Sequence, residues 1–568
     1  MKLAGFLKLC LVLVILLPAL FACNVGNPGN KYDKQDITLK AEEYTAGITD
    51  KGPVKGGILQ LFSTYPDTLD PINSKNEYIQ KYTHLVYESM VILDKDQRPV
   101  EWLSDGWHTS NDGYTWTFSI REGVTWQDGF PLTAEDVEFT IKTILDPQND
   151  SIYKFNLSNI SSCTAIDDRT VNIILKKPNS FTPELMTFPI MPRRFFSSVK
   201  EEDAFKTEFP PGTGPYSLGS YQEKKQIVLK ASRTWWYKKY SDGDFPNIPE
   251  IIIRLYPYST DIYNAFQMRT IDVIKIENEK FNMYLNKPDV FAKLFPSKRF
   301  DFLALNLSNP LLKDKAARQA IASSIDRDEI TSSVMQGWAI PACMPVIPGS
   351  WIYEEDNNQE DNNNQENDNN QEDDNNPDAI PPGEQTTGLK LPGNITNTRL
   401  EILVNNENEL RVKVAEKICE YLSGIGIHAS IRKESWENVL ELVRRKSYDI
   451  ALLGCEVTNF PDVSYLYSTW YMPYFSSANS TPAYNVAGYN NELVNSYINR
   501  IFRENDFDTR KLLFSRIENI INDEVPYIGL YFYLDAVLYD KSIRGELEPH
   551  SWYEYNNIVK WYIIKSGD

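Results

Sequence analysis

The chain has 568 residues, of which 42% are apolar, and a chain of this length exceeds one hydrophobic core, so we expect two or three domains. Acidic residues outnumber basic ones by 78 to 58, and the net charge of −20 excludes the basic surface of a nucleic-acid-binding protein. The four histidines and six cysteines show no metal-ligand spacing and no CxxC pair, so we expect no metal, no cofactor and no disulfide framework.

The first 22 residues have the pattern of a secretory signal peptide. Lys2 and Lys8 precede an apolar run, Leu9–Leu20, that is too short for a membrane span. The end of this segment, Leu20-Phe21-Ala22-Cys23, resembles the bacterial lipoprotein box, in which the cysteine becomes the lipidated first residue. The alternative is an ordinary signal peptide with a chance cysteine. Residues 23–56 are polar and predict a tether between the lipid anchor and the folded protein.

The folded part is expected to begin with a strand at Gly57–Thr64. A turn-rich stretch, Pro66–Pro71, follows it. Apolar residues then recur at helical spacing over Tyr82–Leu93, which predicts a helix there.

A hairpin and a capped helix are predicted next. Asn111-Asp112-Gly113 is a turn sequence that precedes the strand Thr115–Arg121. Thr133 is expected to cap a helix that runs to about Leu145, with Asp136 at the third helical position completing a capping box.

The stretch from Leu400 to Asp462 predicts a parallel β-α-β-α-β unit. Apolar residues recur every four positions from Leu410 to Leu422, and Trp436, Val439, Leu440 and Val443 mark a second helix. Three strands flank these helices: Leu400–Asn405, Ile427–Arg432 and the almost wholly apolar Tyr448–Gly454. Ligands of open α/β sheets bind outside the carboxyl ends of the strands, so we expect the loop Cys455–Asp462 to line the working surface.

One segment, Glu354–Asn376, is a low-complexity tract of Asn, Asp, Glu and Gln. It holds ten acidic residues and no basic or apolar ones, so nothing in it can be buried. We expect a disordered, solvated loop. Calcium capture by the acidic residues is the functional alternative.

One run stands out in the N-terminal half: DGYTWTFSIREGVTWQDGFPLTAEDVEFTIKTILDP. It resembles the signature region of family 5 of the extracellular solute-binding proteins, the oligopeptide- and dipeptide-binding components of ABC importers. Further segments match in the order of the family: Gly212–Tyr216, Asp301–Asp328, Tyr448–Asp462, Tyr484–Tyr489 and Val525–Tyr531. In the second of these, Leu312, Ala316, Ala320 and Ser324 are expected to form the inner face of a helix. The resemblance covers roughly residues 57–568.

The resemblance implies an α/β, periplasmic-binding-protein-like fold of type II (cluster C), with two lobes around a ligand cleft. Lobe I would comprise residues 57–300, with an extra N-terminal subdomain over about 75–185, and lobe II residues 301–532. Residues 533–568 would return to lobe I. The two crossings, near Arg299–Phe302 and Tyr531–Asp535, would act as a hinge.

The resemblance also implies ligand-binding residues. Cys455, Glu456 and Val457 match a segment that pairs with an extended peptide as an added strand. Ser74, Lys75, Asn76 and Glu77 match the facing segment. Trp436 matches a tryptophan beside the cleft, although a simple helix-packing role is equally compatible with its position.

The charged groups that hold peptide ends in the family are absent at the matching positions. The aspartate that pairs with the ligand's amino group falls on Thr458, or on Asn459 if the alignment slips by one residue. The arginine that dipeptide binders use for the ligand carboxylate is missing from Val404–Glu409. Either Glu456 or Asp462 supplies the negative charge from a shifted position, or the ligand has no free amino terminus. The sequence alone slightly favours the second hypothesis.

The function implied is a non-catalytic, monomeric lipoprotein of the cell envelope. It would capture oligopeptides or a related small solute on the outer side of the cytoplasmic membrane, or in the periplasm, and deliver them to an ABC permease and its ATPase. An oligosaccharide-binding member and a peptide-signal receptor remain alternatives. A secreted hydrolase is disfavoured because the sequence contains no GxSxG and no HExxH motif.

Overall fold

The computed structural model describes residues 52–199, 204–205, 209–240, 246–277, 280, 283–284, 287, 289–353, 398–469 and 485–564. The predicted signal peptide, Cys23, most of the predicted tether and the acidic tract Glu354–Asn376 lie outside the described residues. Within them the chain has a mixed α/β fold with three sheets of four or more strands.

The first sheet lies in the N-terminal part of the molecule. Its central strand β10 (Glu250–Tyr256) pairs in parallel with β1 (Ile58–Thr64) and antiparallel with β9 (Gln226–Ala231). The edge strand β8 (Tyr216–Gln222) pairs antiparallel with β9. Strand β1 confirms the predicted first strand.

The second sheet is antiparallel, in the order β4 (Ser104–Thr109), β5 (Thr115–Ile120), β7 (Thr170–Leu175) and β6 (Ile160–Ala165). The predicted turn connects β4 to β5, and Gly113 in it has a φ of 74°, which suits glycine. Helix α2 (Ala134–Leu145) packs on β6 and β7. Its predicted capping box is confirmed, since the N–H of Thr133 donates to Asp136 Oδ2 at 2.9 Å.

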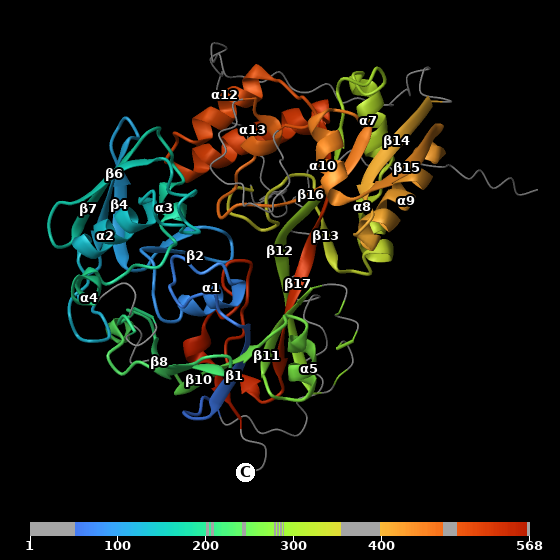
Figure 1. Cartoon of the computed structure of the whole chain (residues 1–568). Coiled ribbons are helices and arrows are strands. Elements are labelled where there is room, and N and C mark those ends of the chain that lie inside the picture. Colours follow the sequence, from blue (N-terminus) through green and yellow to red (C-terminus); the bar gives the residue numbers. More distant parts are fainter. Residues whose placement is uncertain are drawn as a thin grey trace, which may run out of the picture.

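The third sheet joins the two ends of the molecule. Its order is β11 (Val273–Glu277), β17 (Tyr527–Asp540), β12 (Val290–Leu305), β16 (Ile450–Glu456), β14 (Thr398–Asn405) and β15 (Ile427–Glu434), with β13 (Ala339–Pro341) also on β17. The long strands β12 and β17 run side by side from the region of β14 and β15 to that of β1, β10 and β11 (Figure 1).

The predicted β-α-β-α-β unit is confirmed. Helix α9 (Glu409–Gly424) connects β14 to β15, and α10 (Trp436–Arg444) connects β15 to β16. Strand β14 pairs in parallel with both β15 and β16. Gly426 follows α9 with a φ of 82° and turns the chain into β15.

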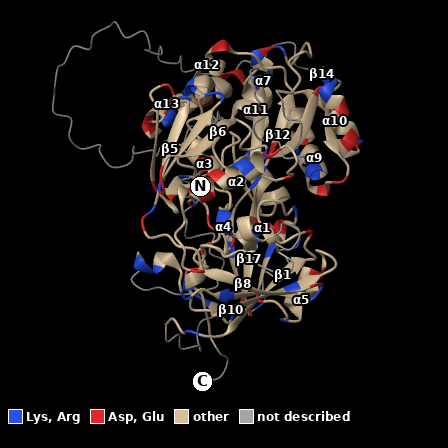
Figure 2. Cartoon of the chain, turned by 60° about the vertical axis from the view of Figure 1, so that its left-hand side comes forward, with Lys and Arg blue, Asp and Glu red and all other residues tan. Residues whose placement is uncertain are grey.

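The other helices cover the sheets and the strand ends. In the N-terminal part these are α1 (Glu77–Thr83), α3 (Thr182–Leu185), α4 (Arg193–Ser198) and α5 (Asp261–Gln267). The C-terminal part comprises β14–β16, α9 and α10 together with α7 (Lys315–Ser324), α8 (Arg327–Glu329), α11 (Ser464–Tyr467), α12 (Glu492–Ile501) and α13 (Phe507–Glu524). Basic and acidic residues are interspersed over both parts (Figure 2).

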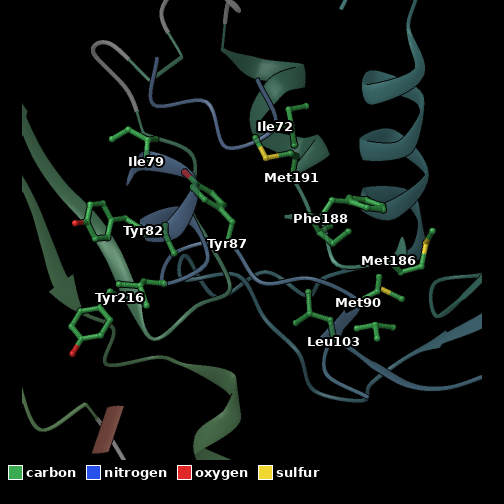
Figure 3. Close-up of a cluster of buried hydrophobic side chains, with 14 of the residues drawn as sticks. Ile72, Ile79, Tyr82, Tyr87, Met90, Leu103, Met186, Phe188, Met191 and Tyr216 are labelled. Carbon is green, nitrogen blue, oxygen red and sulfur yellow. The ribbon is translucent and has the colours of Figure 1, made fainter. Parts of the chain in front are cut away.

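The predicted helix over Tyr82–Leu93 is wrong. Helix α1 begins earlier because the Asn76 side chain accepts from the N–H groups of Tyr78 and Ile79, and it ends at Thr83. The carbonyl groups of Leu85 and Val86 then accept hydrogen bonds from Tyr216 and Gly214, so the chain must leave the helix. The apolar spacing reflects burial in the N-terminal core, where Tyr87 and Met90 lie (Figure 3).

The predicted inner face of α7 is shifted by about one residue. Asp314 caps the helix, accepting from the N–H of Ala316, so Leu312 lies before it. The buried apolar residues of α7 are Ala317, Ala320 and Ile321, whereas Ala316 and Ser324 are only half-buried.

Candidate functional site

Strand β16 ends at a place where only one of its neighbours continues beside it. It pairs with β12 from Ile450 to Glu456, whereas its ladder with β14 pairs Ile450 and Ala451. The N–H of Val457 donates to the carbonyl of Lys298 on β12 at 2.9 Å. The carboxyl end of β16 and the loop after it, residues 457–462, form the candidate site; we call this loop the β16 loop.

The direction of the main-chain groups limits where an added strand could pair. In an antiparallel ladder, alternate residues direct both main-chain groups to opposite edges. Because Val457 bonds to β12, Cys455 also faces β12 and Glu456 faces the other edge. Of the three residues predicted to pair with a peptide, the structure leaves Glu456 in position to do so, and it turns the main chain of Cys455 and Val457 away.

The side chains of these three residues also differ, in their exposure to solvent. Cys455 is buried, with Sγ 3.4 Å from the Tyr465 hydroxyl, and burial raises the pKa of its thiol to about 12. Val457 is also buried, at 6% exposure. The Glu456 side chain is exposed, and among the described residues no Lys or Arg forms an ion pair with it.

The face of β16 that carries Glu456 is lined by a buried ion pair. Gly454 lies two residues earlier and therefore on the same face. A Cβ there would lie 1.8 Å from the Arg411 guanidinium and 2.2 Å from Asp301, so only glycine fits. Arg411 donates to both carboxylate oxygens of Asp301, at 2.8 and 2.7 Å. The Tyr533 hydroxyl donates to Asp301 at 2.8 Å.

Arg411 is a charged residue that sequence reasoning missed. It lies two positions after the segment in which we looked for a ligand-binding arginine. Its guanidinium is committed to Asp301, with a side chain only 14% exposed, so it is not a free clamp for a carboxylate. It lies 5.8 Å from the ring of Trp436, which is half-buried at the start of α10. Trp436 itself packs with the buried cluster that contains Leu453 and Cys455, which is the opposite face of β16 from Gly454 and Glu456.

Thr458 and Asp462 of the β16 loop are engaged by other residues of the protein. Thr458 accepts from the Gln97 amide at 3.0 Å through its carbonyl, and its hydroxyl donates to the carbonyl of Phe460 at 2.6 Å. Asp462 is 3% exposed and accepts from the N–H of Ser464 at 2.7 Å, and burial raises its pKa to about 6. Asp462 thus stabilises the turn into α11 and is not free for a ligand.

Asn459 contacts the strand crossing. Its side-chain oxygen accepts from Lys298 Nζ at 3.1 Å, and the same ammonium lies 4.1 Å from the ring centroid of Trp552. Burial lowers the pKa of Lys298 to about 8. Lys298 therefore attaches the β16 loop to the C-terminal segment that returns to the N-terminal part.

The predicted facing segment, Ser74–Glu77, is engaged within the N-terminal part. Ser74 is buried and donates to Asp67 at 2.7 Å, and Lys75 forms an ion pair with Asp150. Asn76 caps α1, and the exposed Glu77 lies in its first turn. Among the described residues, no hydrogen bond or ion pair connects this segment directly to the β16 loop.

A series of ion pairs instead links α1 to the strand crossing. It alternates in sign, with distances between 2.9 and 3.2 Å, along Lys81, Glu554, Lys275, Asp535, Arg299 and Glu277. Arg299 also lies 4.8 Å from the ring of Tyr533, which contacts Asp301. The charges of the three basic and three acidic residues in this series cancel, as do the charges of Arg411 and Asp301. The exposed carboxylate of Glu456 forms no ion pair with a described residue, although its charge favours the charged form of the nearby Lys298.

The described part of the chain was also searched for a metal site and for a membrane-spanning helix. No group of three or more His, Cys, Asp or Glu side chains is arranged to hold a metal ion. No helix there is long and apolar enough to cross a membrane.

Comparison with protein families identifies relatives over almost the whole chain. Residues 98–477 match the family model described as bacterial extracellular solute-binding proteins, family 5 middle. The oligopeptide-binding protein OppA of Bacillus subtilis is 23% identical over 508 residues, covering 86% of this chain and 89% of OppA. The glutathione-binding protein GsiB of Escherichia coli K12 is 23% identical, covering 84% of this chain and 89% of GsiB.

Solved structures have the same fold. CtaP, an ABC transporter substrate-binding protein of Listeria monocytogenes, aligns over 90% of this chain and 99% of its own with a TM-score of 0.66 and 22% identity. The oligopeptide-binding protein AppA of Bacillus subtilis, in complex with a nonapeptide, aligns over 90% of this chain and 100% of its own, with a TM-score of 0.56 and 21% identity. The expected periplasmic-binding-protein-like fold is confirmed.

Proposed function

This chain belongs to family 5 of the bacterial extracellular solute-binding proteins, and we propose that it captures oligopeptides outside the cytoplasmic membrane for an ABC importer. The observation that supports this most is the match to OppA over 508 residues, which covers most of both chains. Its role is binding and delivery to the permease, without catalysis. A peptide-signal receptor would use the same fold, and loss of peptide uptake on deletion of the gene distinguishes import from sensing.

We propose that Glu456 is the central ligand-binding residue. Its main chain faces the edge of β16 away from β12, where an extended peptide can add as a strand. Its side chain points perpendicular to that edge, onto the face lined by Arg411 and Asp301. A strand residue can therefore pair through its main chain and offer its carboxylate at once.

This geometry changes the balance between the two hypotheses on the ligand's amino terminus. Asp462 is buried in a turn, which removes one of the two shifted carboxylates. The other, Glu456, can offer its carboxylate without leaving the strand. We therefore favour a ligand with a free ammonium group that pairs with Glu456, because a partly buried charge requires such a partner. An uncharged ligand such as an oligosaccharide is the competing outcome.

Calorimetric titration of a tetrapeptide and its N-acetylated form tests this proposal. We expect acetylation to weaken binding to the wild-type protein at least tenfold, and Glu456→Gln to abolish this difference. Glu437→Gln, which removes an exposed carboxylate in the first turn of α10, is the matched control and should behave like the wild type. Equal affinity for both peptide forms, or binding of oligosaccharides alone, would contradict the ammonium site.

A lipid anchor at Cys23 completes the proposal and is supported by the sequence Leu20-Phe21-Ala22-Cys23. Lipidation by two or more acyl chains would hold the protein firmly at the envelope. Replacing Cys23 with Ala should release the protein into the medium or periplasm, which cell fractionation measures. Retention of the Cys23→Ala protein in the membrane fraction would refute lipid anchoring.

A further inference from the structure

A short segment of the N-terminal part enters the core of the C-terminal part. This segment, residues 179–185, follows β7 and includes α3; we call it the docking segment. Phe181 is fully buried, and its ring stacks on Phe460 of the β16 loop with centroids 4.5 Å apart. The N–H of Ser180 donates to the carbonyl of Phe502 at 2.8 Å, and the Ser180 hydroxyl donates to the carbonyl of Ile501 at 2.7 Å.

The residues that follow hold the docking segment in the N-terminal core. Met186 and Phe188 are 1% and 0% exposed. They lie beside Met90 and Leu103 (Figure 3). Phe181 packs in one core and Phe188 in the other, so seven residues of chain connect the N-terminal part directly to the β16 loop. Any separation of the two parts at this place must expose Phe181.

A buried ion pair of unusual geometry completes the contact. Glu184 Oε1 and Arg510 Nη1 are 3.9 Å apart, with side chains 1% and 3% exposed. Among the described residues, both Glu184 oxygens and the Nε and Nη1 atoms of Arg510 accept or donate no hydrogen bond. The guanidinium lies against the rings of Phe507 and Trp351, at 4.3 and 4.7 Å. Burial raises the pKa of Glu184, against the effect of Arg510, and lowers that of Arg510.

These contacts have opposite effects on the docked arrangement. Burial of Phe181 and the two Ser180 hydrogen bonds stabilise it. Two desolvated charges whose attraction is not reinforced by hydrogen bonds destabilise it, relative to apolar side chains of the same size. If one partner alone is removed, the remaining charge is buried without compensation, and the docked arrangement becomes much less stable.

We propose that the docking segment is a releasable latch between the two parts of the molecule, and that the Glu184–Arg510 pair keeps it weak enough to open. Docked, it holds the β16 loop through Phe460; released, it leaves the hydrogen bond from Gln97 to the Thr458 carbonyl as a remaining contact of that loop with the N-terminal part. The proposal rests on the function proposed above only in assigning ligand entry and release as the purpose of the opening.

Amide hydrogen exchange at Ser180 measures the latch without any ligand, because that N–H bonds across the contact. Arg510→Met should reduce protection of the Ser180 amide at least tenfold. The double variant Glu184→Leu, Arg510→Met should restore protection to within threefold of the wild type or exceed it. The matched control is Lys315→Met with Asp523→Leu, an exposed ion pair of the C-terminal part, which should leave Ser180 unchanged. The amide of Trp116 in β5 serves as an internal reference for global unfolding.

The latch is refuted if Arg510→Met changes Ser180 protection no more than the control does. The proposal is equally refuted if the Ser180 amide is as poorly protected in the double variant as in Arg510→Met. Both variants would then simply disrupt the packing around the docking segment. Failure of the peptide titrations would leave this comparison intact, because no peptide is present. With a tetrapeptide that binds, saturating ligand should raise Ser180 protection in the wild type at least threefold; an unchanged value would separate the latch from ligand capture.

Discussion

Glu88 is a buried carboxylate held between two indole groups. It is 5% exposed, and its oxygens accept from Trp235 Nε1 at 3.2 Å and from Trp236 Nε1 at 2.7 Å. Burial raises its pKa to about 7, although the indole hydrogen bonds favour the charged form. Because the folded-state pKa exceeds the unfolded value, the protonated form is favoured by folding. Stability from this group is therefore present below pH 4.5 and lost as the pH rises through 7.

The predicted loss of stability with rising pH can be tested by chemical denaturation between pH 5 and 8. The shift from 4.5 to about 7 corresponds to at most about 3 kcal/mol at pH 8. Glu88→Gln cannot titrate, so its stability relative to the wild type should improve by about 2 kcal/mol over this range. The amide leaves one indole N–H without an acceptor, so the variant should be less stable at pH 5. A constant difference between Glu88→Gln and the wild type over this range would contradict the buried titration.

The helices and strands that could be predicted from the sequence are those in which the local spacing of apolar residues determines the element. The β-α-β-α-β unit followed from the apolar stripes of α9 and α10 and from the apolar strand β16. The prediction of a helix over Tyr82–Leu93 was wrong because the carbonyl groups of Leu85 and Val86 accept hydrogen bonds from Tyr216 and Gly214, about 130 positions later in the chain. Apolar spacing reports burial, and a loop packed in a core can show it as well as a helix.

The sequence predicted only those features of the candidate site that depend on elements adjacent in the chain. Glu456 and Trp436 belong to one β-α-β unit, so topology brings both to the carboxyl edge of the sheet, although α10 packs on the face opposite to Glu456. The direction of the main-chain groups of Glu456 depends on the register with β12, which no spacing reveals. The ion pairs at the crossing join residues far apart in the chain, such as Arg299 and Asp535, which are 236 positions apart. Only the folded arrangement brings them together.

At the scale of the whole molecule, two strands carry the connection between its parts. Residues 290–296 of β12 pair with 534–540 of β17, and residues 300–304 pair with 527–532. The register shifts between Pro296 and Phe300 and again between Asp301 and Phe302, so the ladder is irregular at the crossing. A few residues between two regular ladders are the structure that a hinge requires. We propose that rotation occurs here, with the latch at residues 179–185 as a breakable contact between the two parts.

Small-angle scattering of the purified protein tests this motion. A tetrapeptide that binds between the two parts should favour the docked arrangement and reduce the radius of gyration, because ligand binding shifts the population toward the state with more contacts. Arg510→Met, which weakens the latch, should enlarge the ligand-free protein and therefore increase the reduction on binding. Lys315→Met with Asp523→Leu should match the wild type, since that ion pair is exposed within one part. An unchanged radius under saturating peptide, in both the wild type and Arg510→Met, would exclude closure about the β12–β17 crossing as the mode of capture.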